Sequence, residues 1–381
     1  MKNPTKESQP SGIPAERRAD FLELMLLSRE CDRRSGIVLR QGEAWFHISS
    51  AGHEALAALC ELLGPEDLIF PHYRDRTLLL SRGMDPEAQA RDLMAKADSH
   101  SAGRNMSAHF GHRPGNVFSV ASPTGSQCLP AAGAAWAAQL RGRDTAVVCS
   151  IGDASTRQGE FFEAVAFAVE RHLPVLFLVS DNGYGISTPT AHLTPHALGL
   201  LPESRTTTVD GADPDAVYTA AAKALRTVRG GEGPVVLWCG LDRLDAHTSS
   251  DDHRVYRSAE DLAAMRDPVD TFAARLLAEG TVDETWLRRT RARHADEVEA
   301  VYDRVARESA ADPKHIMEHL FAPAGETAGR RAHDAPGEPL TEPCGGAMVA
   351  AGNRALATRR ARHREHVQFG GDLDDPKGGG V

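Results

Sequence analysis

No apolar run in this 381-residue sequence approaches the ~20 residues that a membrane-spanning helix needs. Its six cysteines form no CxxC pair, so the sequence carries neither a usual zinc pattern nor a usual redox motif. A net charge of -10 excludes the basic excess that is typical of broad nucleic-acid binding. Residues 1–15 lack the apolar core of a secretion signal, and their polar, proline-containing composition predicts disorder. These absences predict a cytoplasmic protein with buried, reduced thiols.

The sequence also lacks the glycine-rich loop of a nicotinamide-dependent dehydrogenase. No GxGxxG motif follows a first strand with an acidic residue ~20 positions further on, which disfavours a Rossmann-type enzyme. What is present is an ordinary globular composition, 41% hydrophobic and 25% charged. A chain of this length holds one large domain or two.

The residues between 145 and 188 predict a βαβ unit, and the other predicted elements are placed relative to it. Two short apolar runs, Thr145–Ile151 and Pro174–Ser180, have the length of buried strands, and Thr156–His172 between them has helical apolar spacing. Ser155 or Thr156 is the expected cap of that helix. Strand, helix and strand at this spacing predict a parallel α/β sheet flanked by helices.

Polar side chains follow both strands of this unit. Gly152 and Asp153 come after the first strand, and Asn182 and the turn around Tyr184 come after the second. Neighbouring parallel strands would bring these ends to within roughly 5 Å at one edge of the sheet. A carboxylate, an amide oxygen and a backbone carbonyl suit Mg²⁺ bound together with a phosphorylated ligand. Each half alone is also an ordinary turn after a strand.

Segments before this unit add an anion site and a cleft. Residues 16–40 have helical spacing, and a second helix over His53–Leu63 is expected after a cap at Ser49 or Ser50. Tyr73 and Arg74 open a helix after the short strand Asp67–Phe70, which favours anion binding, although a surface salt bridge fits this segment equally well. The turn containing Ser122 and Thr124, before the small-residue helix Leu129–Leu140, is expected to face the same cleft.

The chain after residue 190 completes the sheet and adds a helical region. Strands are expected over Thr206–Asp210 and Pro234–Gly240, and the second opens into a polar loop that contains His247. The domain prediction is a disordered segment at 1–15, a main domain at 16–321, a linker at 322–343 and a last segment at 344–381. Within the main domain, residues 259–320 are predicted to be helical, with caps near Ser258, Asp267 and Asp283.

The chain resembles a known family over its main domain. The Gly152-Asp153 and Asn182 pairing resembles the thiamine diphosphate motif, and the segments PHYRDR, GRNMSAHFG, ASPTGSQ, SDNGYGISTPT and AHTSSDDHRVYRS extend the likeness. Together they are similar to the alpha subunit of the decarboxylating component of 2-oxo acid dehydrogenases. The ISTPT and TSSDD segments resemble the branched-chain type more than the pyruvate type.

The resemblance implies a thiamine diphosphate enzyme that oxidatively decarboxylates a 2-oxo acid and passes the acyl group to a lipoyl arm. It implies Mg²⁺ ligands, phosphate contacts, a catalytic histidine, residues along the aminopyrimidine and a potassium-binding turn. The implied Mg²⁺ ligands are Asp153, Asn182 and the Tyr184 carbonyl, and the implied phosphate contacts are Tyr73, Arg74 and His247, of which His247 is also the catalytic histidine. Ser122 and Thr124 would line the aminopyrimidine, and Gly152 and Ala154 belong to the cofactor-binding motif. The potassium-binding turn would consist of Pro123, Ser126 and Gln127.

The chain departs from the family pattern at three positions of the motif. Ala154 stands where glycine is usual, Ser180 where an arginine often helps to hold phosphate, and Asp181 where the first asparagine of a pair is usual. With serine at position 180, Arg74 is expected to carry more of the phosphate binding. The oxygen ligands themselves are unchanged.

Residues 344–381 resemble the opening of a beta subunit of the same component. The resemblance implies a heterotetramer with beta-type subunits that supply the glutamate activating the cofactor, and a lipoyl-bearing acyltransferase as a further partner. Two alternatives remain open: a non-oxidative or acetoin-type thiamine diphosphate enzyme with the same site residues, and a catalytically silent, truncated fragment.

Overall fold

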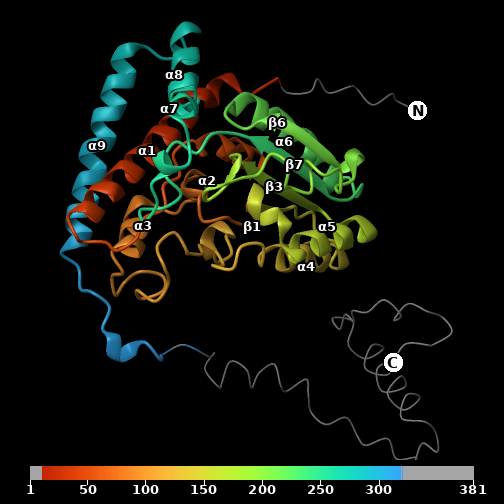
Figure 1. Cartoon of the computed structure of the whole chain (residues 1–381), viewed down its shortest axis with the longest axis horizontal. Helices are drawn as coiled ribbons and strands as arrows, with labels where there is room; N and C mark the ends of the chain where they lie inside the picture. Colours follow the sequence, from red (N-terminus) through yellow and green to blue (C-terminus); the bar gives the residue numbers. More distant parts are fainter. Residues whose placement is uncertain (1–10, 319, 321–381) are drawn as a thin grey trace, which may run out of the picture. The chain divides into compact units, whose positions relative to one another are not determined.

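The computed structural model describes residues 11–318 and 320. These residues contain a five-stranded parallel sheet in the order β1-β2-β3-β7-β6 (Figure 1). The predicted α/β fold, a parallel sheet flanked by helices, is confirmed. The strands are β1 (Leu68–Phe70), β2 (Val147–Gly152), β3 (Val175–Asp181), β6 (Thr206–Asp210) and β7 (Val235–Gly240).

Helices cover both faces of the sheet, and α8 and α9 form the predicted helical region after it (Figure 1). None of the described helices is long and apolar enough to cross a membrane. The α-helices are α1 (Ala15–Arg40), α2 (Arg76–Ser81), α3 (Pro86–Leu93), α4 (Cys128–Leu140), α5 (Gly159–Arg171), α6 (Pro214–Arg229), α7 (Ala259–Ala263), α8 (Pro268–Ala278) and α9 (Glu284–Ala306). Short 3-10 helices are η1 (Glu54–Leu62), η2 (Arg113–Gly115), η3 (Asp153–Arg157), η4 (Glu203–Arg205), η5 (His253–Val255) and η6 (Pro313–His315).

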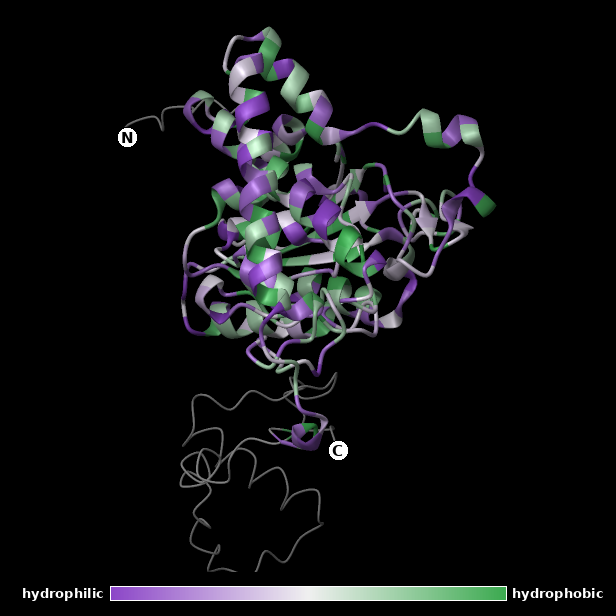
Figure 2. Ribbon diagram, turned by 90° about the vertical axis from the view of Figure 1, so that its left-hand side faces the viewer, coloured by the Kyte–Doolittle hydropathy of each residue, from purple (hydrophilic) through white to green (hydrophobic). Residues whose placement is uncertain are grey.

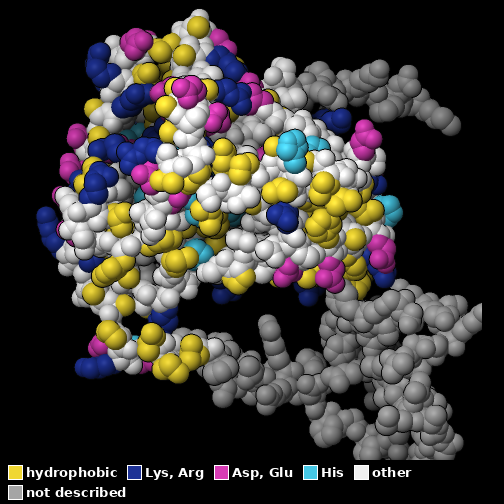
Figure 3. Space-filling view, viewed as in Figure 1, with side chains coloured by type: hydrophobic (Ala, Val, Ile, Leu, Met, Phe, Trp, Pro, Cys, Tyr) yellow, Lys and Arg dark blue, Asp and Glu magenta, His cyan; other side chains and the backbone are white. Residues whose placement is uncertain are grey.

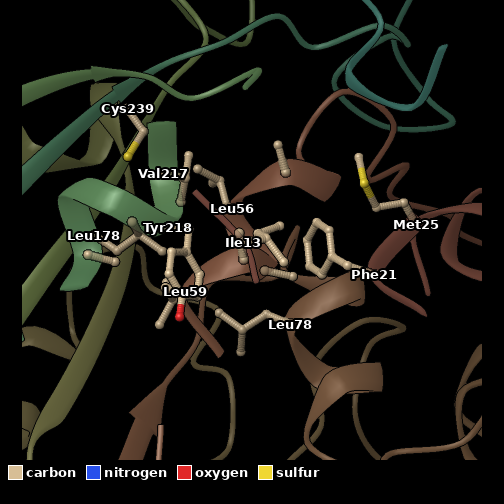
Figure 4. Close-up of a cluster of buried hydrophobic side chains, with 14 of the residues drawn as sticks. Ile13, Phe21, Met25, Leu56, Leu59, Leu78, Leu178, Val217, Tyr218 and Cys239 are labelled. Carbon is tan, nitrogen blue, oxygen red and sulfur yellow. The ribbon is translucent and has the colours of Figure 1, made fainter. Parts of the chain in front are cut away.

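Alternate residues of the central strands enter two separate cores, as the two-residue period of a strand requires. Val148 and Leu176 face the core that α1, η1 and α6 share, where Phe21, Leu56 and Tyr218 also pack (Figure 4). The adjacent residues of those strands, Val147 and Phe177 among them, face the core under α4 and α5. Because both faces are covered, the strands read as continuous apolar runs rather than as alternating ones.

Charged side chains are unevenly distributed over the surface of the described residues. Figure 2 shows hydrophobic positions on the strands and on the inner sides of the helices, with hydrophilic positions outward. Figure 3 shows lysine and arginine side chains gathered on the side where α1, α8 and α9 lie. Much of this charge is paired between helices, as in the ion pair of Arg293 on α9 with Glu23 on α1. The helical region is thus fixed to α1 partly through its charges.

Three of the predicted helix caps are confirmed. Ser258, Asp267 and Asp283 accept backbone N–H groups at the starts of α7, α8 and α9, and so they satisfy donors that a helix N-terminus leaves unpaired.

Two other predicted caps are wrong. The helix after β2 begins at Gly159 with Gln158 as its N-cap, because Ser155 and Thr156 lie inside η3. Ser49 and Ser50 do not cap the next segment either, since both contact the carboxylate of Asp32, and that segment is the 3-10 helix η1 rather than an α-helix.

The predicted domain boundaries lie largely outside the described residues. The linker at 322–343 and the segment at 344–381 fall there entirely, and so does Cys344. The described end of the predicted N-terminal segment packs against the domain: Ile13 is buried, and its N–H donates to Asp215 Oδ1 at 2.9 Å. Cys31, Cys60, Cys128, Cys149 and Cys239 are free thiols.

Candidate functional site

A cavity of about 400 Å³ lies at the carboxyl ends of β2 and β3. The two strands are parallel neighbours, and Gly152 on β2 is aligned with Ser180 on β3. This register places Asp153 and Asn182, which are 29 residues apart in the sequence, in the wall of the same cavity. The edge of a parallel sheet beyond its carboxyl ends is where open α/β folds bind ligands, and this volume suits a small cofactor.

Most of the predicted site residues line this one cavity. They come from five separate parts of the chain: the turns after β1, β2 and β3, the loop after β7, and the turn before α4. The ones that line it are Tyr73, Arg74, Ser122, Thr124, Gly152, Asp153, Ala154, Asn182, Tyr184 and His247. The predicted potassium-binding residues Pro123, Ser126 and Gln127 lie in the turn before α4 and are not part of the lining.

Asp153 is a buried carboxylate with several donors directed at it. The hydroxyl of Thr190 donates to its Oδ2, and the backbone N–H groups of Ala154 and Asn182 also donate hydrogen bonds to the carboxylate. Burial nevertheless raises the pKa of Asp153 to about 7, and the nearby charge of Asp181 adds to that rise. A bound cation would remove this penalty, because a positive charge favours the ionised form of a carboxylate.

The second half of the motif offers an oxygen without a partner. Asn182 Oδ1 is buried and accepts no hydrogen bond from any described residue. Tyr184 follows in the two-residue strand β4 (Tyr184–Gly185), which pairs with β5 (Thr188–Pro189). A Cβ on Gly185 would lie 2.6 Å from the Cβ of Ala154, so alanine at position 154 requires glycine at 185. The unusual Ala154 is therefore accommodated by the glycine at position 185.

Two arginines in the cavity wall are buried without a carboxylate partner. Arg74 is 2% exposed and Arg243 is 1% exposed, yet neither forms an ion pair within the described part of the chain. Arg29 and Arg34, by contrast, are each paired with two carboxylates. Burial lowers the pKa of Arg74 below its ordinary value. Buried cations without a counter-charge are costly, so this pair points to an anionic ligand.

The position of Arg74 differs from the prediction in one respect. The helix α2 begins at Arg76, so Tyr73 and Arg74 lie in the turn before it rather than in its first turn. Arg74 Nη1 donates to the carbonyl of Ser49 at 2.7 Å. The alternative of a surface salt bridge is wrong, because Arg74 and Asp75 are both buried and the Asp75 carboxylate accepts the N–H of His72.

Arg74 also determines which nitrogen of His247 carries the proton. Arg74 Nη2 lies 3.1 Å from His247 Nδ1 and 2.9 Å from the His247 carbonyl oxygen. A guanidinium only donates, so Nδ1 must accept, and the neutral ring carries its proton on Nε2. Burial and the charges of Arg74 and Arg243 lower the pKa of His247 to about 4, so the ring is neutral at pH 7.

The loop that carries His247 is fixed at both of its ends. At the start, Gly52 packs so closely that a Cβ there would lie 1.9 Å from the carbonyl oxygen of Asp242, and its φ of +97° also favours glycine. Further on, Asp251 accepts the backbone N–H of His247 at 2.7 Å and the hydroxyl of Tyr256. The backbone that carries His247 is thus held in place by contacts within the fold.

The sequence prediction missed several residues of the cavity wall. Arg243 is three residues beyond β7, so the same reasoning that singled out His247 on that loop could have found it. His72, a buried imidazole whose two nitrogens have no hydrogen bond to a described residue, follows β1 in the same way. Thr190 and the apolar part of the wall, formed by Phe46, Ile48, Met106 and Ile186, gave no local signal.

The long loop before η2 brings Met106 and His109 to the cavity, and Asp92 on α3 supports it. Asp92 Oδ2 accepts the N–H of Ala108 at 2.8 Å, while its Oδ1 has no hydrogen bond to a described residue. Burial raises the pKa of Asp92 to about 7. Ionising this carboxylate is therefore less favourable in the folded chain than in the unfolded chain.

We expect Asp92→Asn to stabilise the chain at alkaline pH. In the wild type, Asp92 ionises above pH 4 in the unfolded chain but only near pH 7 in the folded chain. The folded state therefore loses stability relative to the unfolded state as pH rises from 4 to 7. Asparagine keeps an acceptor for Ala108, so the free energy of unfolding at pH 8 should rise by about 2 kcal/mol. Melting temperatures of both chains from pH 4 to pH 8 test this; parallel profiles would contradict it.

The predicted potassium turn has oxygen atoms close together. Ser126 donates both its N–H and its hydroxyl to the Pro123 carbonyl, at 3.2 and 2.7 Å. Gln127 donates its amide to the Ser150 carbonyl at 2.8 Å, which leaves its Oε1 buried without a partner in the described chain. The turn therefore offers one unpaired oxygen, and the potassium site stays a prediction.

A parallel α/β sheet with buried arginines and a buried, unpaired amide oxygen at its carboxyl edge suits an anionic ligand. Residues 22–314 match the family described as "Dehydrogenase E1 component", and the chain belongs to that family. It is 32% identical to the 2-oxoisovalerate dehydrogenase subunit alpha of Bacillus subtilis, over 84% of this chain and 99% of that protein. It is 31% identical to the mitochondrial subunit alpha 1 of Arabidopsis thaliana, over 61% of this chain and 51% of that protein, and 26% identical to the bovine mitochondrial subunit.

These comparisons confirm the resemblance to branched-chain alpha subunits. The chain is thus an enzyme of the 2-oxo acid dehydrogenase class, and thiamine diphosphate is the cofactor that its family implies. The residues of the cavity fit that cofactor: buried arginines without carboxylates suit a diphosphate, and Asn182 Oδ1 beside Asp153 suits a hard cation. The likeness of residues 344–381 to a beta subunit lies outside the described residues.

Proposed function

We propose that this chain is the alpha-type subunit of a branched-chain 2-oxo acid dehydrogenase, which binds Mg²⁺ and thiamine diphosphate in the cavity at the carboxyl ends of β2 and β3. The observation that carries the proposal is the meeting of Asp153 and Asn182 beside two buried arginines that have no carboxylate partner among the described residues. The substrate is oxidatively decarboxylated and its acyl group passes to a lipoyl-bearing acyltransferase. A beta-type subunit completes the site with its activating glutamate, in a heterotetramer.

The binding roles follow from charge and from available lone pairs. Asp153, the Oδ1 atom of Asn182 and the Tyr184 carbonyl would hold Mg²⁺, which prefers oxygen ligands and shares its coordination with phosphates and water. Arg74 and Arg243 would neutralise the diphosphate. Arg243 would supply the second positive charge that the family's arginine at position 180, here Ser180, often provides. Tyr73, Ser122 and Thr124 line the remaining part of the same wall.

Thiamine diphosphate supplies the electron sink for decarboxylation when it is bound. The part of His247 is to present a proton at Nε2, because Nδ1 is occupied by Arg74 and the ring is neutral. That N–H can stabilise developing negative charge and relay a proton as the acyl group leaves for the lipoyl arm. The apolar wall of Phe46, Ile48, Met106 and Ile186 suits an aliphatic substrate side chain.

The test is release of CO₂ from carboxyl-labelled 2-oxo acids by the full chain mixed with a beta-type subunit. We expect release from 2-oxoisovalerate to exceed release from pyruvate and to require Mg²⁺, thiamine diphosphate and an artificial electron acceptor. Release that needs no acceptor, with acetoin-type products, would favour a non-oxidative enzyme. No release from either acid with the beta-type subunit present would favour a silent fragment.

A further inference from the structure

Three neighbouring strands of the sheet end in one row at its carboxyl edge. Asp181, the last residue of β3, is aligned with Gly240 on β7, which is aligned in turn with Asp210 at the end of β6. Two carboxylates thus occupy equivalent positions in the sheet. Only Asp181 is followed directly by a proposed metal ligand, Asn182.

The carboxylate of Asp181 joins the rigid sheet to the turn that carries Asn182. Its Oδ2 accepts the indole N–H of Trp238 at 2.6 Å, and Trp238 is a β7 residue that is only 2% exposed. Its Oδ1 accepts the backbone N–H of Gly183 at 3.0 Å. One side chain therefore fixes the turn to a buried ring on the neighbouring strand.

The same turn is held from its other side by Thr190. Its N–H donates to the Gly183 carbonyl at 2.9 Å, and its hydroxyl donates to Asp153 Oδ2. Gly183 itself has a φ of +74°, a conformation that side chains rarely adopt. Asn182 and the Tyr184 carbonyl thus lie on a short segment whose geometry depends on Asp181 and Thr190.

An asparagine, the usual residue at this position in the thiamine diphosphate motif, could not make both contacts of Asp181. A carboxylate accepts at both oxygens, whereas an amide accepts at one end and donates at the other. With asparagine, either the Trp238 indole or the Gly183 amide would face an NH₂ group. The unusual acid therefore matches the two donors that face it, the Trp238 indole and the Gly183 amide.

We propose that Asp181 is a positioning residue for the metal site: it holds the Asn182–Tyr184 turn through Gly183 and Trp238. The inference rests on the proposed function, because it assumes that Mg²⁺ and thiamine diphosphate bind at this turn. Asp181 is not itself assigned as a ligand, since both of its oxygens already accept hydrogen bonds.

Calorimetric titration of the full chain with Mg²⁺ at saturating thiamine diphosphate tests this role. We expect Asp181→Asn to weaken Mg²⁺ binding about tenfold, which corresponds to one lost charge-assisted hydrogen bond. Trp238→Phe, which removes only the indole donor, should weaken it about threefold. Asp210→Asn is the matched control, because Asp210 Oδ1 also accepts the N–H two residues on, from Ala212 at 3.0 Å, and it should change the Kd less than twofold.

An unchanged Mg²⁺ Kd in Asp181→Asn, while the wild type binds the cofactor normally, would overturn the proposal. If the melting temperature of that variant without cofactor were also lowered, with the Kd measured well below it, Asp181 would be merely structural. A wild-type chain that binds no thiamine diphosphate at any Mg²⁺ concentration would instead overturn the proposed function on which this inference rests.

Discussion

Asp153→Ala is expected to abolish Mg²⁺-dependent binding of thiamine diphosphate. Asp153 is the one charged group among the three proposed ligands, and it is 1% exposed at the tip of β2. Changes that only disturb the surroundings of a metal ligand cost 10–100-fold in affinity, so loss of the ligand itself should raise the Kd at least about 100-fold. Calorimetry with and without Mg²⁺ measures this, and an unchanged Kd would refute the ligand assignment.

Asp153→Asn separates the charge of this ligand from its shape. Asparagine keeps an oxygen near the Thr190 hydroxyl and is almost the same size as aspartate. Because burial raises the pKa of Asp153 to about 7, removing the charge relieves a cost in the folded chain, and the melting temperature without cofactor should not fall. Weak cofactor binding in a variant of undiminished stability would identify a residue kept for function. A clear loss of stability would contradict this explanation of its raised pKa.

His247→Ala is expected to lower turnover by about 10²–10⁴-fold while changing the thiamine diphosphate Kd less than about threefold. The reason is that Arg74 Nη2 also donates to the His247 carbonyl oxygen, at 2.9 Å, and that contact does not depend on the side chain. Arg74 should therefore stay in the cavity wall. Cofactor affinity from calorimetry and turnover from CO₂ release, measured on the same preparation with the beta-type subunit, test this split.

His247→Asn is the matched variant for this prediction. Its amide oxygen can replace Nδ1 as the acceptor for Arg74, but it places no N–H where Nε2 carries the proton. Turnover should stay low if the proton at Nε2 matters. Recovery of turnover in His247→Asn would show that the ring serves only to position Arg74, and an equal loss of binding and turnover in His247→Ala would argue against a catalytic role.

The strands that build the site could be predicted because their signals are local. β2, β3 and β7 are buried on both faces, so each reads as a short apolar run that ends in a polar turn. The meeting of Asp153 and Asn182 then follows from the pairing of neighbouring parallel strands. The caps of α7, α8 and α9 were predictable for a related reason, since an N-cap side chain bonds within its own first turn.

The features that could not be predicted depend on contacts between distant segments. Ser49 is adjacent to a helical pattern, yet it donates to Asp32 on α1, and nothing in its own segment indicates that choice. The pair of Asp181 and Trp238 joins residues that are 57 positions apart and requires the β3–β7 register. Arg243 could be placed on the loop after β7 from the sequence, but its burial without a carboxylate partner among the described residues becomes visible only in the folded chain.

Mn²⁺ in place of Mg²⁺ offers the most direct test of the site. Crystals of the full chain grown with Mn²⁺ and thiamine diphosphate would give an anomalous difference peak at the metal. The peak is expected within coordination distance of the Asp153 carboxylate, the Asn182 Oδ1 atom and the Tyr184 carbonyl, with the diphosphate near Arg74 and Arg243. A metal and diphosphate bound elsewhere, with Asp153 and Asn182 making no contact to either, would contradict the account.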